Sequence, residues 1–344
     1  MSEQQPATPS PIRRESPAST SRLSPRRLWE RLVFVAYLGL MKGVGLMPPR
    51  PVEAIFSTLA PLAYLLWPAK RRIADGNAAV VLGVADPDGR PLPGSAAQVR
   101  ARSLAVYRSY GRYTAELLRL PSRSLADIAA EVDLEVTGLL DEYRARKQPA
   151  IFVGFHAGNN ELGAAALAER RYDVNVVGDD SAFPEMYELL RRLRASWGIT
   201  MIDWRAIREV FGVMRRGGIL VLLSDWGWKP DGTPCRLFGR WTTLPSGPAV
   251  IAARGNAPIV PFFVRRERPG AFRIIFGEPV DAGNGSPAAQ LAATQATASE
   301  MERLMRSDPT QWNCFKPLWP NAVEQARLAT RAEEMATQTE RGAA

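Results

Sequence analysis

The sequence contains very few of the side chains that bind transition metals or form disulfides. It has one histidine, His156, and two cysteines, Cys235 and Cys314, in 344 residues. The cysteines lie far apart and form no CxxC pair, so they build no disulfide framework and favour a reducing compartment. A zinc site of the usual kind needs several closely spaced His or Cys ligands, and the HExxH motif is absent. We therefore expect no metal.

Long hydrophobic runs are also missing near the start of the chain. A membrane-spanning helix requires ~20 consecutive apolar residues, whereas the apolar runs cover only residues 32–41 and 54–69. Residues 1–25 are rich in Pro and Ser, and no apolar core occurs among the first twenty residues. We therefore predict a disordered tail and no secretory signal. The GxSxG motif of serine hydrolases does not occur, which argues against a covalent serine intermediate.

Aromatic and basic residues flank the two apolar runs. Pro48 and Pro49 end the first run, and residues 70–72, Lys-Arg-Arg, close the second. Trp29 and Trp67 occupy positions typical of anchors at a membrane interface. This pattern predicts a membrane-associated helical hairpin that enters one leaflet. A pair of buried core helices has the same pattern, and the sequence leaves both interpretations open.

Positive charge exceeds negative charge in this chain. There are 44 Lys and Arg against 35 Asp and Glu, a net charge of +9. Such an excess predicts an anionic partner. Arg is not interleaved with aromatic residues in an RNA-binding pattern. We therefore expect an anionic membrane surface or anionic substrates as partners, and no nucleic acid.

Short apolar runs alternate with helical segments in the second part of the chain. The predicted strands are 134–138, 150–154, 173–178, 218–225, 257–264 and 271–277, and the predicted helices are 159–170, 183–195, 205–216, 246–255 and 286–307. This rhythm predicts an α/β fold with a mixed, largely parallel central sheet flanked by helices. Residues 70–120 are predicted to form further helices on either side of a Gly/Pro loop at 83–94.

These patterns divide the chain into four segments. We predict a disordered tail at 1–25, a helical membrane-associated region at 26–120, an α/β domain at 121–320 and a polar C-terminal tail at 321–344.

The single histidine lies at a chemically informative place. His156 follows the predicted strand 150–154, Glu161 comes five residues later, and Asp225 closes the strand 218–225. Ligands of open α/β sheets bind at the carboxyl ends of the strands. A carboxylate bonded to one imidazole nitrogen would leave the other as a general base, and amides at the next helix start would stabilise an oxyanion. A hydrogen-bonded turn histidine without a catalytic role has the same spacing.

Several motifs, in this order, resemble a known family. They are RRIADGN (71–77), YGRYTAELLRLP (110–121), FHAGNNE (155–161), VLLSDWGWKPDG (221–232), FGRWTTLPSGPAVIAARGNAPIVPFFVRR (238–266) and DPTQWNCFKPLWP (308–320). The chain resembles the glycerolipid-type acyltransferases over roughly residues 28–320. It is most similar to the branch of late lipid A acyltransferases and mycobacterial phosphatidylinositol mannoside acyltransferases.

The resemblance implies an O-acyltransferase. Acyl-CoA or acyl carrier protein would be the co-substrate, with no other cofactor. The acceptor would be a hydroxyl of a membrane glycolipid or phospholipid at the cytoplasmic face of the inner membrane. His156 would be the general base, with Glu161 at the motif position and Asp225 at a second family carboxylate, and either acid could orient the imidazole. The alternatives are a catalytically inactive membrane adaptor with this fold and a lysophospholipid acyltransferase of glycerolipids.

The candidate substrate-binding residues are Gly158, Asn159, Arg205, Arg240, Thr242, Ser246 and Gly247. Solvated surface charges at Arg205 and Arg240 and a helix cap at Ser246 fit the sequence equally well. Two departures separate the chain from the lipid A branch. No arginine occurs in VVGDDSAFP (176–184), and Gly227 stands where that branch has a second acid. The LPSGPA loop and the W-x-x-F-x-P-x-W ending favour the mannoside-acylating branch.

Overall fold

The computed structural model describes residues 25–134, 137–178 and 184–338. Except for Pro25, the predicted disordered tail lies outside these residues, as does most of the segment in which the lipid A branch carries its arginine. The chain divides into two compact units, residues 1–40 and 41–344. The first unit holds most of helix α1 (Pro25–Gly45), and the second holds all other elements.

Three further helices follow α1 before the sheet begins. They are α2 (Pro49–Leu66), α3 (Pro68–Val81) and α4 (Ala96–Arg119). Helices α2 and α4 pack closely because Gly111 has no side chain, since a Cβ there would lie 2.4 Å from the carbonyl oxygen of Phe56. In the described chain no helix taken singly has the length and hydropathy of a membrane span. Helices α2 and α3, which are bent by 103° relative to each other at Trp67, reach the length and hydropathy of a span only when they are taken together.

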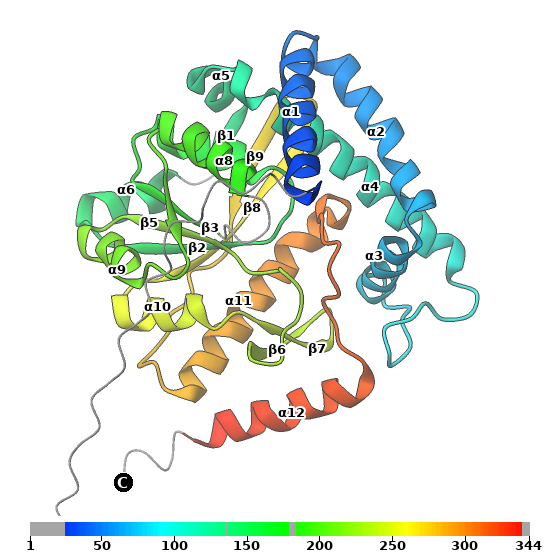
Figure 1. The fold of residues 1–344 in the computed structure, drawn as a ribbon. Coiled ribbons are helices and arrows are strands. Elements are labelled where there is room, and N and C mark those ends of the chain that lie inside the picture. Colours follow the sequence, from blue (N-terminus) through cyan, green and yellow to red (C-terminus); the bar gives the residue numbers. More distant parts are fainter. Residues whose placement is uncertain (1–24, 135–136, 179–183, 339–344) are drawn as a thin grey trace, which may run out of the picture. The chain divides into compact units, whose positions relative to one another are not determined.

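A seven-stranded sheet lies at the centre of the second unit (Figure 1). Its strands in spatial order are β1 (Val132–Leu134), β9 (Ala271–Phe276), β8 (Ile259–Arg268), β2 (Ala150–Gly154), β5 (Ile219–Leu223), β3 (Val174–Gly178) and β4 (Thr200–Asp203). Neighbouring strands are parallel except for β8 and β9, which are antiparallel. The predicted fold class is confirmed.

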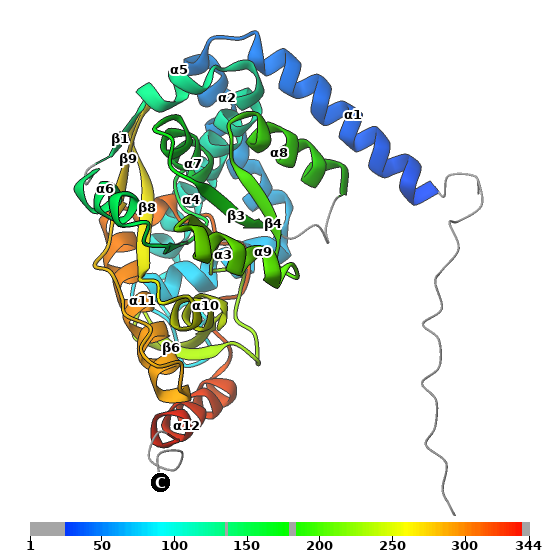
Figure 2. The same ribbon diagram turned by 90° about the vertical axis from the view of Figure 1, so that its left-hand side faces the viewer.

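Helices cover both faces of this sheet (Figure 2). One face packs against α5 (Leu125–Ala130), α6 (Thr137–Arg146), α7 (Asn160–Glu169) and α8 (Pro184–Ser196), and the other against α9 (Ile207–Arg216), α10 (Gly247–Gly255) and α11 (Pro287–Ser307). Alternation along a strand explains the two layers. Phe152 of β2 joins the first cluster, whereas Ile151 and Val153 join the second.

The structure differs from the sequence prediction in several elements. The predicted strand 134–138 is wrong in its bounds, because β1 ends at Leu134 and α6 begins at Thr137. Strand β4 and the two-stranded hairpin of β6 (Thr233–Leu237) and β7 (Arg240–Leu244) were not predicted. The hairpin strands carry few apolar residues, and their turn has positive φ at Phe238 and Gly239, a geometry suited to tight hairpins.

The C-terminal part also contains more structure than expected. The short 3₁₀ helices η1 (Leu120–Ser122) and η2 (Pro309–Gln311) follow α4 and α11. Helix α12 (Ala322–Thr337) occupies the segment predicted as a polar tail. Its Leu328 and Ala332, one helical turn apart, are buried, which is enough to dock an otherwise polar helix.

A buried ionic network ties α4 to the central sheet. Both nitrogens of the Arg266 fork donate to the carboxylate of Glu116, at 2.6 and 2.7 Å, and both side chains are under 10% exposed. The Asn159 amide donates to the same carboxylate at 2.8 Å. Gln311 exchanges two hydrogen bonds of 2.8 Å with the backbone of Arg266. This network connects helix α4, strand β8, the start of α7 and η2.

We expect Glu116→Gln to lower the free energy of unfolding by about 3–5 kcal/mol, because it leaves the Arg266 charge buried without its counter-charge. Chemical denaturation of the purified protein measures this loss. Glu142→Gln is the matched control, since Glu142 pairs with Arg146 on the surface of α6 and its loss is expected to cost less than about 1 kcal/mol. Equal losses in the two variants would contradict the role given to the network.

Candidate active site

The sheet register brings His156 and Asp225 together. Strands β2 and β5 are parallel neighbours, with Gly154 opposite Leu223. His156 lies two residues beyond the first of these, and Asp225 two residues beyond the second. The imidazole Nδ1 lies 2.6 Å from Oδ1 of Asp225, and the His156 amide donates to Oδ2 at 2.9 Å. Both groups therefore lie at the carboxyl edge of the sheet, where ligands of such folds bind.

Asp225 is held by donors on two segments distant in sequence. Its side chain is 0% exposed. Besides the two groups of His156, the indole Nε1 of Trp312 donates to Oδ2 at 2.8 Å. The Trp312 ring itself stacks between Phe155 and Phe238, with centroid distances of 5.1 and 5.8 Å. The carboxylate is thus fixed in position, and each of its oxygens accepts from at least one donor.

This geometry determines which nitrogen of His156 is available for chemistry. A carboxylate accepts hydrogen bonds only, so Nδ1 carries the proton and Nε2 presents its lone pair. In the described part of the chain no group hydrogen-bonds Nε2. The side chain is 37% exposed, and its ring lies 5.4 Å from that of Trp226. The imidazole is therefore both oriented and accessible.

The environment of His156 changes its basicity. Burial by itself lowers the pKa of His156, but the charge of Asp225 and the hydrogen bond to it outweigh burial, so the net pKa is raised above 6.5. A raised pKa means that the base form predominates only at higher pH. The same carboxylate stabilises the imidazolium that would form when Nε2 accepts a proton.

The turn between β2 and α7 is structural rather than open to a ligand. Gly158 has φ +58, and a Cβ there would lie 1.7 Å from the carbonyl oxygen of Val264. Asn159 is fully buried and caps α7 by accepting from the Leu162 amide. The amides of residues 157, 158 and 159 donate to other carbonyls. These three amides are therefore already bonded within the protein and are not free to stabilise an oxyanion.

Glu161 is directed away from His156. Its carboxylate accepts from both Nε, at 3.0 Å, and a terminal nitrogen of Arg194 on α8. Both side chains are close to 90% buried. Burial disfavours the charge on Arg194, yet Glu161 outweighs it and the net pKa of Arg194 is raised. Of the two acids left open by the sequence, Asp225 contacts the imidazole, and Glu161 joins α7 to α8.

A cavity of about 500 Å³ opens beside the His–Asp pair. Trp226 and Gly227, which follow Asp225, form part of its wall. Most of the remaining wall is apolar, and β5, α9 and α10 contribute to it through Leu222, Phe211, Val250 and Ile251. The volume lies within the ~300–1,000 Å³ typical of ligand pockets. Predominantly apolar walls favour a hydrocarbon occupant.

Two of the remaining predicted substrate residues reach this cavity. Ser246 and Gly247 line it at the start of α10. Thr242 is buried and donates to the carbonyl of Leu318.

The two predicted arginines have partners of their own. Arg240 donates to the carbonyls of Asp86 and Pro87, and burial lowers its pKa. Arg205 is half-exposed, pairs with Asp203 at 3.6 Å and lies over Trp204. Neither is among the residues that line the 500 Å³ cavity.

Sequence reasoning missed the residues that the C-terminal segment adds to the site. Trp312 binds Asp225, and the Lys316 ammonium lies 4.7 Å from the ring centroid of Trp226. Both belong to the WNCFKPLW stretch. That pattern carried the resemblance, but 87 residues separate Trp312 from Asp225. Only the fold reveals their contact.

Comparison with known proteins identifies the family to which this geometry belongs. The family model described as bacterial lipid A biosynthesis acyltransferase matches residues 19–321. The chain belongs to this family. The resemblance seen in the motifs is confirmed. The protein is therefore an acyltransferase of glycolipid biosynthesis.

Individual relatives point to one branch. The phosphatidylinositol mannoside acyltransferases of two Mycobacterium tuberculosis strains, CDC 1551 / Oshkosh and H37Rv, are each 27% identical over 233 residues, which is 65% of this chain and 72% of theirs. The phosphatidylinositol mannoside acyltransferase of Mycolicibacterium smegmatis is 23% identical over 231 residues, covering 65% of this chain and 74% of its own. The chain is similar to these three proteins.

We expect Asp225→Asn to lower the pKa of His156, because burial then acts without the opposing carboxylate. The sequence has one histidine, so in a tag-free protein its ring proton gives a single NMR titration curve. Glu161→Gln removes a carboxylate that bonds Arg194 instead and is expected to leave the titration unchanged. A shift in the Glu161 variant without one in the Asp225 variant would reverse this assignment.

Proposed function

We propose that the protein transfers a fatty acyl group from a thioester to a hydroxyl of a membrane glycolipid, with His156 as general base. The observation that carries the proposal is the accessible imidazole, oriented by buried Asp225, at the edge of an apolar cavity of about 500 Å³. Acyl-CoA or acyl carrier protein is the proposed donor. The names of the relatives support a phosphatidylinositol mannoside-like acceptor, with a lipid A-like acceptor as the alternative.

The cavity suits the acyl chain of the donor. Its apolar walls would remove the chain from water, which is favourable by roughly 25 cal/mol per Å² of apolar surface. Trp226 borders this cavity and also contacts the imidazole ring. A chain lying in the cavity would therefore end with its thioester carbonyl beside His156. Ser246 and Gly247, at the same cavity, would contact the donor rather than the acceptor sugar.

The chemistry requires one base and no covalent intermediate with the protein. Nε2 of His156 accepts the proton of the acceptor hydroxyl as its oxygen attacks the thioester carbonyl carbon. The tetrahedral intermediate collapses, the C–S bond breaks, and the proton on Nε2 passes to the departing thiolate. Asp225 remains ionised and stabilises the imidazolium between the two proton transfers. The products are an ester and a free thiol.

Helix α2 supports placement at a membrane surface. Ile55, Leu59, Leu62 and Leu66 recur at helical spacing along one exposed stripe. Trp67 follows at the helix end, also exposed, and basic residues 70–72 come next. Water-exposed leucines beside a Trp and a basic cluster are typical of a helix that lies in an anionic interface. We propose the cytoplasmic face of the inner membrane, where acyl thioesters are available.

We expect His156→Ala to lower kcat for acyl transfer by roughly 10²- to 10⁴-fold, because it removes the general base. The assay uses labelled acyl-CoA with a phosphatidylinositol mannoside in mixed micelles, and circular dichroism verifies that the variant is folded.

Glu161→Gln tests the other acid in the same assay. Its specific activity per folded molecule is expected to stay within about tenfold of the wild-type value, since Glu161 bonds Arg194 and acts on the fold. Equal transfer by the wild type and the His156 variant would refute the mechanism and favour an inactive adaptor.

We expect Val250→Trp, which fills the cavity from α10, to shift donor preference toward shorter chains. The ratio of kcat/KM for a 16-carbon over an 8-carbon thioester should fall by about tenfold or more, since a bulky ring and a long chain cannot share the space. Val323→Trp is the matched control, because Val323 is exposed on α12. An unchanged ratio in the Val250 variant would show that the acyl chain lies elsewhere.

A further inference from the structure

A lysine that the mechanism does not use lies at the open side of the site. The Lys316 Nζ is 4.7 Å from the ring centroid of Trp226, and the His156 ring is 5.4 Å from the same indole. Lys316 is exposed, and Trp226 is 53% exposed. In the described chain no carboxylate forms an ion pair with this ammonium. One indole therefore separates an unneutralised cation from the proposed base.

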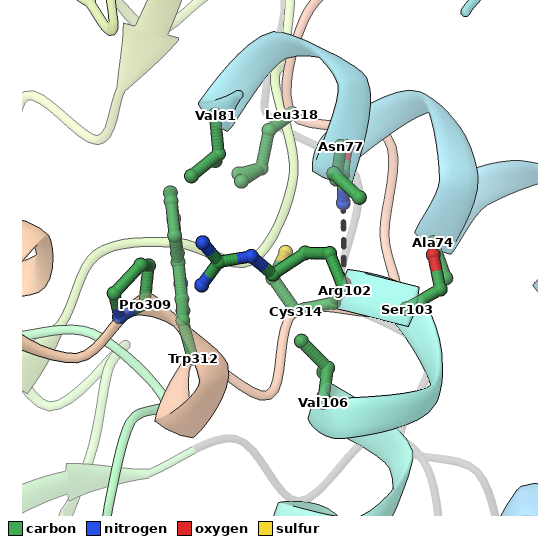
Figure 3. Close-up of a pocket in the computed structure, with 11 residues that line it drawn as sticks. Ala74, Asn77, Val81, Arg102, Ser103, Val106, Pro309, Trp312, Cys314 and Leu318 are labelled. Atoms are coloured by element: carbon green, nitrogen blue, oxygen red, sulfur yellow. Dashed lines mark hydrogen bonds between the residues drawn. The ribbon is translucent and has the colours of Figure 1, made fainter. Parts of the chain in front are cut away.

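The backbone that carries Lys316 is fixed in place. The Asn77 amide of α3 donates to the carbonyls of Cys314 and Lys316, at 3.1 and 2.9 Å, and Figure 3 shows the first of these bonds beside Trp312. Lys70 donates to the carbonyl of Phe315 at 3.2 Å. On the other side, the Trp228 amide donates to the Pro317 carbonyl at 3.0 Å. The backbone around Lys316 is thus held by two other segments of the chain, α3 and the loop that carries Trp228.

The surroundings of Lys316 make it a local source of positive charge. Lys70 brings a second ammonium to the adjacent residue. Burial and the charge of Asp225 raise the pKa of the Cys314 thiol, while Lys316 and Lys70 both oppose that rise. The acid that bonds His156, Asp225, is fully buried and already accepts three hydrogen bonds. Lys316 is exposed and Lys70 is half-buried, and among the described residues neither ammonium forms an ion pair with a carboxylate.

We propose that Lys316 binds a phosphate oxyanion of a substrate and thereby positions that substrate against His156. A flexible ammonium is a common phosphate ligand, and contact with an aromatic face leaves its N–H groups free to donate. The proposal rests on the proposed acyl transfer and deepens it by adding a phosphate contact. Two substrates could supply this chemistry, namely the phosphodiester of the acceptor lipid and the phosphates of CoA.

The position of Lys70 favours the lipid. Lys70 follows the exposed end of α2, where Leu65, Leu66 and Trp67 face water. Because Lys70 also bonds Phe315, that apolar surface and Lys316 lie near the same side of the site. A lipid headgroup at that surface would therefore lie near the ammonium of Lys316.

The test compares Lys316→Met with the wild type in four assays. The donor is acyl-CoA or acyl-pantetheine, which lacks the phosphates, and the acceptor is a phosphatidylinositol mannoside or a mannosyl diacylglycerol without phosphate. With phosphate-bearing partners, the variant should raise KM by roughly ten- to a hundredfold with a smaller change in kcat, as expected for a lost charge-assisted hydrogen bond. Lys316→Arg should restore most of this loss.

The neutral substrates identify the source of the phosphate. If the defect disappears with mannosyl diacylglycerol, Lys316 binds the acceptor, and if it disappears with acyl-pantetheine, it binds the donor. A defect that persists with both neutral substrates would mean that Lys316 only supports Trp226, and the proposal would be overturned. No defect in any assay would overturn it as well.

A control and a second measurement separate this proposal from the proposed function. Lys147→Met alters an exposed lysine that precedes β2, at the opposite edge of the sheet, and its KM values should match the wild type. Binding of alkyl-CoA and of phosphatidylinositol micelles by calorimetry needs no turnover. If the wild type transfers no acyl group, the proposed function fails. The calorimetry still tests the phosphate contact: weaker phosphate-dependent binding by the Lys316 variant supports it, and unchanged binding overturns it.

Discussion

The arrangement of this site depends on one buried carboxylate. Asp225 has no exposed side-chain surface and must find hydrogen-bond donors inside the protein, because an unpaired buried charge is costly. It finds them in the amide and ring of His156 and in the indole of Trp312. These bonds join the residues that follow β2 and β5, which the sheet already makes neighbours, to the segment after α11. The same bonds orient the imidazole and raise its basicity.

Glu161, the acid of the FHAGNNE motif, serves the fold. Glu161 forms a buried pair with Arg194, and Glu116 forms another with Arg266 that also holds Asn159. These pairs fix the end of the turn at which α7 begins. Removing one partner of a buried ion pair destabilises the protein, since the other charge stays buried without its counter-charge. Glu161 therefore acts on the stability of the fold, whereas Asp225 acts on the imidazole.

Charge and apolar surface meet at Trp226. One side of this residue borders the apolar cavity, while its ring contacts both His156 and the ammonium of Lys316. A lipid acyltransferase must bring a hydrocarbon chain, a hydroxyl and charged headgroups to one place. Excluding water from the apolar part strengthens the electrostatic interactions at its edge. An indole suits this boundary because it packs against hydrocarbon and interacts with a cation through its face.

The sequence by itself determined the layered α/β fold and the carboxyl-edge positions of His156 and Asp225, because apolar periodicity and strand ends are local properties. The family followed from the resemblance of the ordered motifs. It did not determine which acid bonds the imidazole. That choice depends on strand order, which makes β2 and β5 neighbours, and on Arg194, which captures Glu161. Hairpin β6–β7 was missed because its strands carry few apolar residues. The Trp312 bond and the place of Lys316 required the tertiary structure, because contacts between residues some 90 positions apart leave no periodic signal in the chain.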